Sequence, residues 1–280
     1  MSNRPHYFAR SQVNLVRIVW MLVATILALM TVFPLLWMVS IAFKGPTEVF
    51  APSFFPKAPT LNNFIYVLTA VPFVRYLLNT FLFAATVTIA ALFFHSMAGY
   101  ALARLRFPGR EFIFLSIFST FLVSLPVIIV PLFILVRAMG MINSFPGLII
   151  PSIFNAFGIF LLRQYYLSLP RELEEAAVID GAGYWTIYWS VILPLSRPIL
   201  SALAILFFLA NWNAFLWPLT VASDDKLWVV QVGIANFKSQ YASSWNYIMA
   251  ASTIVAAPML VLFVIFQRQI MESIKTSGLK

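Results

Sequence analysis

The chemically active side chains of this sequence are concentrated between residues 169 and 194, in the stretch LPRELEEAAVIDGAGYWTIYWSVILP. Four of the nine acidic residues of the chain lie there, namely Glu172, Glu174, Glu175 and Asp180. Carboxylates that a short helix presents outward can form ion pairs with the basic groups of another molecule. The first chemistry that the sequence predicts is therefore recognition of a basic partner.

The local pattern of this stretch predicts two helices joined by a turn. Pro170 suits a first helical turn, where its missing N–H costs nothing, and three glutamates follow near the positive helix end. Gly181 and Gly183 are expected to break this helix because glycine readily adopts left-handed backbone angles. A second helix is expected to start near Tyr184 and to stop at Pro194.

Such a helix–turn–helix has two possible roles. It could dock into a groove on another protein, where Ala176, Ala177 and Gly181 would permit close approach. It could instead be an amphipathic loop that rests on the membrane face. A helix that binds anionic lipid is expected to be rich in Lys and Arg, whereas this one is acidic, which favours a protein partner.

The composition of the chain places the stretch in a membrane protein. Of the 280 residues, 62% are hydrophobic and 10% are charged, whereas a soluble domain has about 25% charged residues. The chain has no cysteine, which excludes disulfides, thiolate nucleophiles and cysteine metal sites. The fold class predicted is all-α, a polytopic membrane protein.

A helix needs about 20 mostly apolar residues to cross a bilayer. Six segments qualify and contain no Asp, Glu, Lys or Arg: 18–43, 77–103, 112–136, 144–162, 199–220 and 245–267. The first segment is too long for a signal peptide and lacks a cleavage site, so it is expected to be retained. A membrane domain over residues 18–267 would then include the 169–194 loop, between the fourth and fifth segments.

The distribution of Lys and Arg predicts the orientation, since positively charged loops remain cytoplasmic. Twelve of the 18 basic residues lie on the side that holds both termini and the 169–194 loop, and six lie on the other. Residues 1–17 and the tail 268–280 are therefore expected to be cytoplasmic. The predicted location is the cell (inner) membrane of a bacterium or archaeon, crossed several times.

Several kinds of chemistry are missing from the sequence. No Gly-Lys dipeptide occurs, so there is no P-loop for ATP. The two histidines, His6 and His95, are far apart, which argues against a zinc site. His95 lies within a predicted span, where neutral packing and proton transfer are both possible, and packing is favoured. We expect no catalytic residue, no metal and no cofactor bound by this chain.

A longer pattern in the acidic stretch resembles the EAA loop of ABC importer permeases. Glu175-Ala176-Ala177 is followed after three residues by Gly181 and, after nine more, by Val191-Ile192-Leu193-Pro194. Only Val191 departs from the family pattern, in which isoleucine is usual. GYALARLRFPGR (99–110), NWNAFLWPL (211–219) and the terminal FQRQIMESIKTSGLK are similar to the carbohydrate-type, or maltose-type, branch. Family members often have Glu where this chain has Ala214.

The resemblance implies a division of labour. A second permease subunit would complete the solute pathway, an extracytoplasmic binding protein would deliver the solute, and two ATPase subunits would use ATP and Mg²⁺. The EAA segment would form the coupling helix, and the tail 269–280 would also reach the ATPases. The residues implied in ATPase coupling are Glu172, Glu175, Ala176, Ala177, Asp180, Gly181, Leu193 and Pro194.

Polar and aromatic residues near the span ends are candidates for the solute path. These are Asn79, Asn155, Asn211, Trp212, Asn213 and Trp217. Amides bind sugar hydroxyls and indoles stack on sugar rings, although helix packing and interfacial anchoring are alternative roles. The alternative function, a secondary transporter or channel, would need charged residues within the spans, and an intramembrane enzyme would need catalytic groups there.

Overall fold

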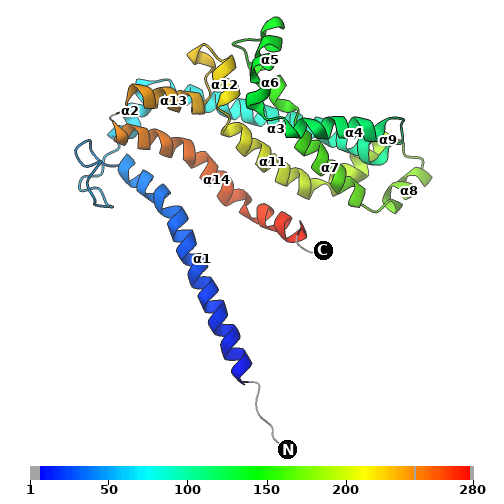
Figure 1. Cartoon of the computed structure of the whole chain (residues 1–280), viewed down its shortest axis with the longest axis horizontal. Coiled ribbons are helices and arrows are strands. Elements are labelled where there is room, and N and C mark those ends of the chain that lie inside the picture. The colour runs from blue at the N-terminus through cyan, green and yellow to red at the C-terminus, as the bar shows by residue number, and fades with distance from the viewer. Residues whose placement is uncertain (1–6, 243, 278–280) are drawn as a thin grey trace, which may run out of the picture. The chain divides into compact units, whose positions relative to one another are not determined.

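A computed structural model describes the backbone of residues 7–242 and 244–277 and the side chains of residues 17–242 and 244–266. Every regular element among these residues is helical, as predicted (Figure 1). The chain divides into two compact units, one formed by Met1–Ala70 with Lys238–Ile254 and the other by Val71–Phe237 with Val255–Lys280. The predicted 1–17 and 268–280 segments lie largely outside the described side chains.

Three long helices pass a length-and-hydropathy test for a membrane span. They are Arg17–Ala42 within α1 (Tyr7–Ala42), the whole of α3 (Phe73–Arg104) and Trp245–Phe266 within α14 (Trp245–Ser277). Three bent helix pairs pass the same test, so the described residues hold up to six spans. These pairs are Arg110–Leu122 with Leu125–Ala138, Phe145–Ile153 with Ala156–Ser168, and Tyr184–Leu195 with Arg197–Trp212.

The segments 112–136 and 144–162, each predicted as one span, are bent pairs of helices. The first is split into α4 (Arg110–Ser119) and α5 (Leu125–Ala138), with a bend of 107°. Ser124 is extended and Pro126 lies in the first turn of α5, where it has no N–H to continue the preceding helix. The second is split by 41° between α6 (Phe145–Ile153) and α7 (Ala156–Ser168).

The predicted span 199–220 is also interrupted. Helix α11 (Arg197–Trp212) ends before Asn213, and the short helix α12 (Leu216–Val221) follows. The helix pair that passes the span test instead extends toward the N-terminus: it combines Arg197–Trp212 with Tyr184–Leu195, and the two are joined by a bend at Ser196. Hydropathy alone places the apolar segment correctly but does not show where the helix axis changes direction.

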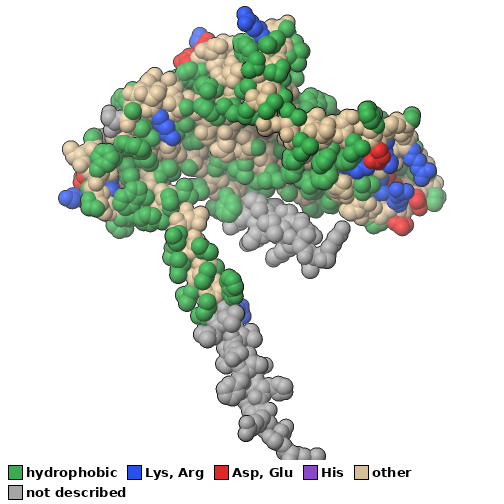
Figure 2. Space-filling model, viewed as in Figure 1, with side chains coloured by type: hydrophobic (Ala, Val, Ile, Leu, Met, Phe, Trp, Pro, Cys, Tyr) green, Lys and Arg blue, Asp and Glu red, His purple; other side chains and the backbone are tan. Residues whose placement is uncertain are grey.

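The first unit is tied together by one buried amide. The Asn63 side chain, on α2 (Asn62–Ala70), donates to the carbonyl oxygens of Ala42 and Lys44, both at 2.8 Å. Its Oδ1 accepts from Asn246 Nδ2 at 2.8 Å. The end of α1, the short α2 and the start of α14 are therefore fixed to one another. The membrane-spanning part of α1 is otherwise exposed and apolar (Figure 2).

The second unit is built around α3, which packs against α7 and α11 (Figure 1). Glycines allow this close approach: a Cβ on Gly99 would lie 2.9 Å from Leu162 Cβ, and one on Gly158 would lie 2.4 Å from His95 Nδ1. Small residues at such crossings let membrane helices pack backbone to backbone. This group of packed helices carries both the acidic stretch and the cavity that are described next.

Candidate functional site

The acidic stretch folds into two helices joined by a sharp turn, as predicted, and we call residues 172–183 the elbow. Helix α8 (Glu172–Ile179) is followed by its C-cap Asp180 and then by Gly181, whose φ is +81°. Two hydrogen bonds close the turn, from Gly181 N to Val178 O at 3.0 Å and from Ala182 N to Ala177 O at 2.9 Å. This pair of bonds is a Schellman motif, which requires the left-handed angle that glycine supplies.

Gly183 plays a different part from the one predicted. Its φ of −78° and ψ of 168° are extended, and it precedes α9 (Tyr184–Ile187). Only Gly181 therefore needs glycine for its backbone angles, although a Cβ at either position would meet no atom within 4 Å. The turn is specified by one glycine, and its outer surface is open.

The second helix does not stop at Pro194. It widens into a π turn at Tyr188–Ile192 and continues through α10 (Leu193–Leu195) to Ser196. In a regular α-helix, the Pro194 ring would clash with the carbonyl of the residue four positions earlier. The π turn immediately before Pro194 removes that clash, so the helix continues past Pro194. It ends at the 74° bend between Leu195 and Arg197.

One glutamate of the elbow holds it to the end of α3. Glu174 Oε1 lies 2.8 Å from Arg104 Nε, and Arg104 NH2 also donates to Leu169 O at 2.6 Å. Burial raises the pKa of Glu174, while the positive charges of Arg104 and Arg171 oppose this rise. This ion pair was not predicted. Helical spacing places Glu174 on a different side of α8 from Glu172, two positions away, but it does not reveal Arg104 as the partner.

The remaining carboxylates of the elbow face outward. Glu172, Glu175 and Asp180 are exposed and form no ion pair with any residue that the structure describes. Ala176 is exposed beside them and Ala177 is half-buried. Among the described residues no group of three or more acidic or histidine side chains is arranged to hold a metal. The elbow thus presents small side chains together with negative charges that have no ion-pair partner in the part of the chain whose side chains are described.

Leu193 and Pro194 lie apart from this outward surface. Leu193 packs against the hydrophobic core of the second unit, whose members include Tyr188 and Ile192, and Pro194 is exposed at the end of the second helix. Leu193 and Pro194 therefore belong to the helices that carry the elbow and not to the outward surface of the elbow.

Four of the six predicted solute-path residues line one cavity of about 790 Å³ in the second unit. They are Asn155, Asn211, Asn213 and Trp217. The other two lie elsewhere. Asn79 Nδ2 donates to the carbonyl oxygens of Lys226 (2.8 Å) and Trp228 (3.0 Å), and these bonds hold the backbone of residues 226–228 to α3. Trp212 is buried, and the centroid of its ring lies 5.8 Å from that of Phe208.

The cavity lies against the break between α6 and α7, and His95 stabilises that break. Asn155 Oδ1 accepts from Phe157 N at 2.8 Å, which caps α7. His95 Nε2 accepts from Asn155 N at 3.1 Å. This contact uses a ring nitrogen as a hydrogen-bond acceptor, which is consistent with a packing role for His95. The buried His95 ring thus holds the bend between α6 and α7, and Asn155 at this bend lines the cavity.

Comparisons with known proteins agree on one family. The family described as binding-protein-dependent transport system inner membrane component matches residues 95–276. The arabinooligosaccharides transport system permease protein AraQ of Halalkalibacterium halodurans is 34% identical over 259 residues, which cover 91% of this chain and 93% of that protein. The diacetylchitobiose uptake system permease protein NgcG of Streptomyces coelicolor is 32% identical, covering 88% and 83%.

Two further comparisons extend this result. The sn-glycerol-3-phosphate transport system permease protein UgpE of Yersinia pestis is 35% identical over 199 residues, covering 70% of this chain and 71% of that protein. A crystal structure of a bacterial ABC transporter involved in the import of the acidic polysaccharide alginate contains a chain that superposes with a TM-score of 0.81. The identity is 22%, over 96% of this chain and 99% of that one, so this likeness shows the fold.

Proposed function

Because the chain belongs to the family of binding-protein-dependent transport system inner membrane components, the permeases of ABC importers, we propose that it carries a sugar or a related polyol or glycerophosphate into the cell. It is a transport subunit and not an enzyme, as the family shows. The relatives named for arabinooligosaccharides, diacetylchitobiose and sn-glycerol-3-phosphate support this class of solute.

The observation that carries the mechanism is the outward, unpaired charge of the elbow. Glu172, Glu175 and Asp180 have no ion-pair partner among the described side chains, and the Gly181 turn presents them together with Ala176. A basic cleft on an ATPase subunit would satisfy these carboxylates, and the small side chains would permit close contact. ATP and Mg²⁺ would then act on the partner, and closure of the ATPases would move the elbow.

The transmission of that movement follows from the contacts of the elbow. Arg104 joins Glu174 to the end of α3, and α3 packs against α7 and α11. A displacement of the elbow would therefore reach the helices that border the cavity of about 790 Å³. Because packed helices shift as units, this route can couple ATP hydrolysis to the solute path.

The cavity is the proposed path of the solute. Asn155, Asn211 and Asn213 bring amide groups to a wall that also includes aromatic Phe121 and Trp217. A mixture of amides and aromatic faces suits a sugar, whose hydroxyls form hydrogen bonds and whose ring faces are apolar. Ala214 also lines this cavity, so the glutamate that many family members have there is replaced by a methyl group.

The partner subunits are proposed from the family and from exposed surfaces. An apolar groove of about 570 Å³ between α3, α11 and α14 in the second unit suits a helix of a second permease. A binding protein would deliver the solute on the side opposite the elbow. We also propose that both termini are cytoplasmic, a prediction that rests on the distribution of basic residues.

Replacing Ala210 with tryptophan tests the solute path. Ala210 is exposed on α11 and lines the cavity, so an indole there would fill space that the solute needs. In vesicles that contain the full transporter and its binding protein, we expect uptake of a labelled sugar to fall by about tenfold or more, because entry would be blocked sterically. ATP hydrolysis by the ATPase subunits of the assembled complex should persist.

The matched control is Leu206→Trp, an exposed position on the same helix outside this cavity. It should transport at a rate close to the unmodified protein. Equal uptake by the Ala210→Trp variant would exclude this cavity as the path. A screen of labelled oligosaccharides, polyols and glycerophosphates against the partner binding protein would identify the solute.

A further inference from the structure

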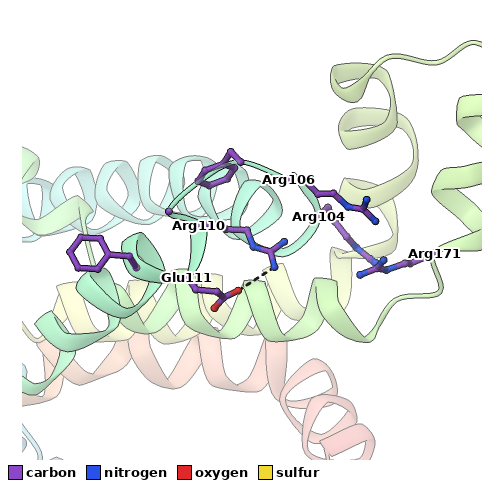
Figure 3. Close-up of a pocket in the computed structure, with 8 residues that line it drawn as sticks. Arg104, Arg106, Arg110, Glu111 and Arg171 are labelled. Atoms are coloured by element: carbon purple, nitrogen blue, oxygen red, sulfur yellow. Dashed lines mark hydrogen bonds and ion pairs between the residues drawn. The ribbon is translucent and has the colours of Figure 1, made fainter.

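A second pocket, of about 540 Å³, lies beside the junction of α3 and α4 and is rich in arginine (Figure 3). Its lining consists of Arg104, Arg106, Phe107, Gly109, Arg110, Glu111, Phe112 and Arg171. Four guanidinium groups and one carboxylate therefore face one small volume. An arrangement of this kind attracts an anion, since guanidinium forks match phosphate and carboxylate oxygens.

The internal carboxylates neutralise only part of this charge. Glu111 binds Arg163 through both oxygens, at 2.8 and 3.0 Å, and also contacts Arg110 at 3.2 Å. The charge of Arg104 is matched by Glu174. Arg106 and Arg171 form no ion pair within the described part of the chain. In Figure 3 Arg110 turns toward Glu111, whereas the side chains of Arg106 and Arg171 lie apart from it.

The pocket lies where two membrane-spanning segments end. Helix α3 ends at Arg104, and α4 begins at Arg110 after the left-handed Gly109, whose φ is +78°. The first turn of α4 has no side-chain cap, so the positive end of the helix adds to the field of the arginines. Phe112 is 75% exposed at the rim. Arginines beside exposed aromatic rings are typical of the level of lipid headgroups.

We propose that this pocket binds the phosphate group of an anionic phospholipid. Arg106 and Arg171 would hold the phosphate oxygens, and Phe107 and Phe112 would contact the acyl chains or the glycerol. An acidic surface on an ATPase subunit is the competing occupant. The elbow argues against it, because its exposed carboxylates require a basic partner surface, which the arginines would repel.

The lipid would have a structural consequence for the transporter. Arg104 lies in the pocket and also fixes the elbow through Glu174, so a bound headgroup would add negative charge next to that ion pair. The proposed lipid site lies where the chain leaves the membrane, and it does not depend on which solute is carried. Its failure would thus leave the proposed transport function untouched.

The test compares lipid retention by the full transporter purified from vesicles of phosphatidylcholine with phosphatidylglycerol. Native mass spectrometry counts bound phosphatidylglycerol for the unmodified protein, an R106Q/R171Q variant and an R197Q control. Arg197 is an exposed arginine outside the pocket. We expect the double variant to bind phosphatidylglycerol about 25-fold more weakly, roughly fivefold for each arginine removed. The control should bind normally, and R106K/R171K should recover much of the affinity.

Three outcomes would overturn the proposal. One is equal retention of phosphatidylglycerol by the unmodified protein and the double variant. Another is displacement of the lipid by inorganic phosphate at physiological concentration, which would make this a free-anion site. The third is loss of the ATPase subunits from the double variant with lipid retention unchanged, which would assign the pocket to a protein partner.

Discussion

Gly181→Pro is expected to leave the chain inserted in the membrane and to lower solute-stimulated ATP hydrolysis of the assembled transporter at least tenfold. Proline fixes φ near −65° and has no N–H. It therefore cannot adopt the +81° of Gly181 or donate to Val178 O. The Schellman turn would be lost, and Glu175 and Ala176 would no longer be presented in their present orientation. The measurement is ATP turnover with and without loaded binding protein.

Paired alanine substitutions provide the control for this prediction. Gly181→Ala introduces a side chain at a left-handed position, at a cost of about 1–2 kcal/mol. Gly183→Ala makes the same chemical change at a φ of −78°, where any residue is tolerated. Both sites are open, so sterics do not distinguish them. We expect impaired coupling for the first and normal coupling for the second. Equal activity of the two, together with normal turnover of Gly181→Pro, would refute the role of the turn.

Glu175→Lys is expected to abolish coupling by a different route. The carboxylate is exposed and has no internal partner among the described residues, so its reversal should not affect folding. If it forms an ion pair in a basic cleft of the ATPase, losing that pair and adding a repulsion would cost about 2–5 kcal/mol. That corresponds to roughly 30-fold weaker association or more. Co-purification of the ATPase and stimulated ATP turnover would both report it.

Charge-reversal rescue separates docking from indirect damage. A basic residue of the ATPase cleft replaced with glutamate should restore activity to Glu175→Lys and not to Gly181→Pro. Glu174→Gln provides a second comparison, because Glu174 binds Arg104 within this chain. It should loosen the seating of α8 and should not be rescued by a change in the ATPase. Unchanged ATPase association in Glu175→Lys would contradict the docking role.

The sequence predicted the parts of the fold that depend on local chemistry. Gly181 was expected to break α8, and it does so with a left-handed angle. The apolar segments were placed where the helices lie, because the bilayer requires about 20 apolar residues whatever the tertiary structure. The family followed from the EAA pattern, and the matched region 95–276 contains it.

The features that the sequence did not predict depend on tertiary contacts. The bend of 107° between α4 and α5 includes the extended residues Val123 and Ser124, which precede Pro126. Pro194 was expected to end its helix, yet a π turn accommodates it. The Glu174–Arg104 pair joins residues 70 positions apart, which helical spacing within the loop cannot reveal.

The same reasoning applies to the cavity. Asparagine and tryptophan near span ends indicated a polar path, and four of the six candidates line one volume. Nothing in the composition distinguished Asn79, whose amide is used by the backbone of Lys226 and Trp228. Which amide faces a cavity and which satisfies a loop depends on the packing of the helices.

Site-specific cross-linking between the elbow and the ATPase tests the central claim most directly. The chain has no cysteine, so Ala176→Cys provides a single thiol at an exposed position beside Glu175. In the reconstituted transporter we predict rapid cross-linking to a cysteine in the ATPase cleft, both without nucleotide and with ATP bound, and protection from soluble thiol reagents. A thiol that reacts freely with those reagents and forms no cross-link in any nucleotide state would contradict the account.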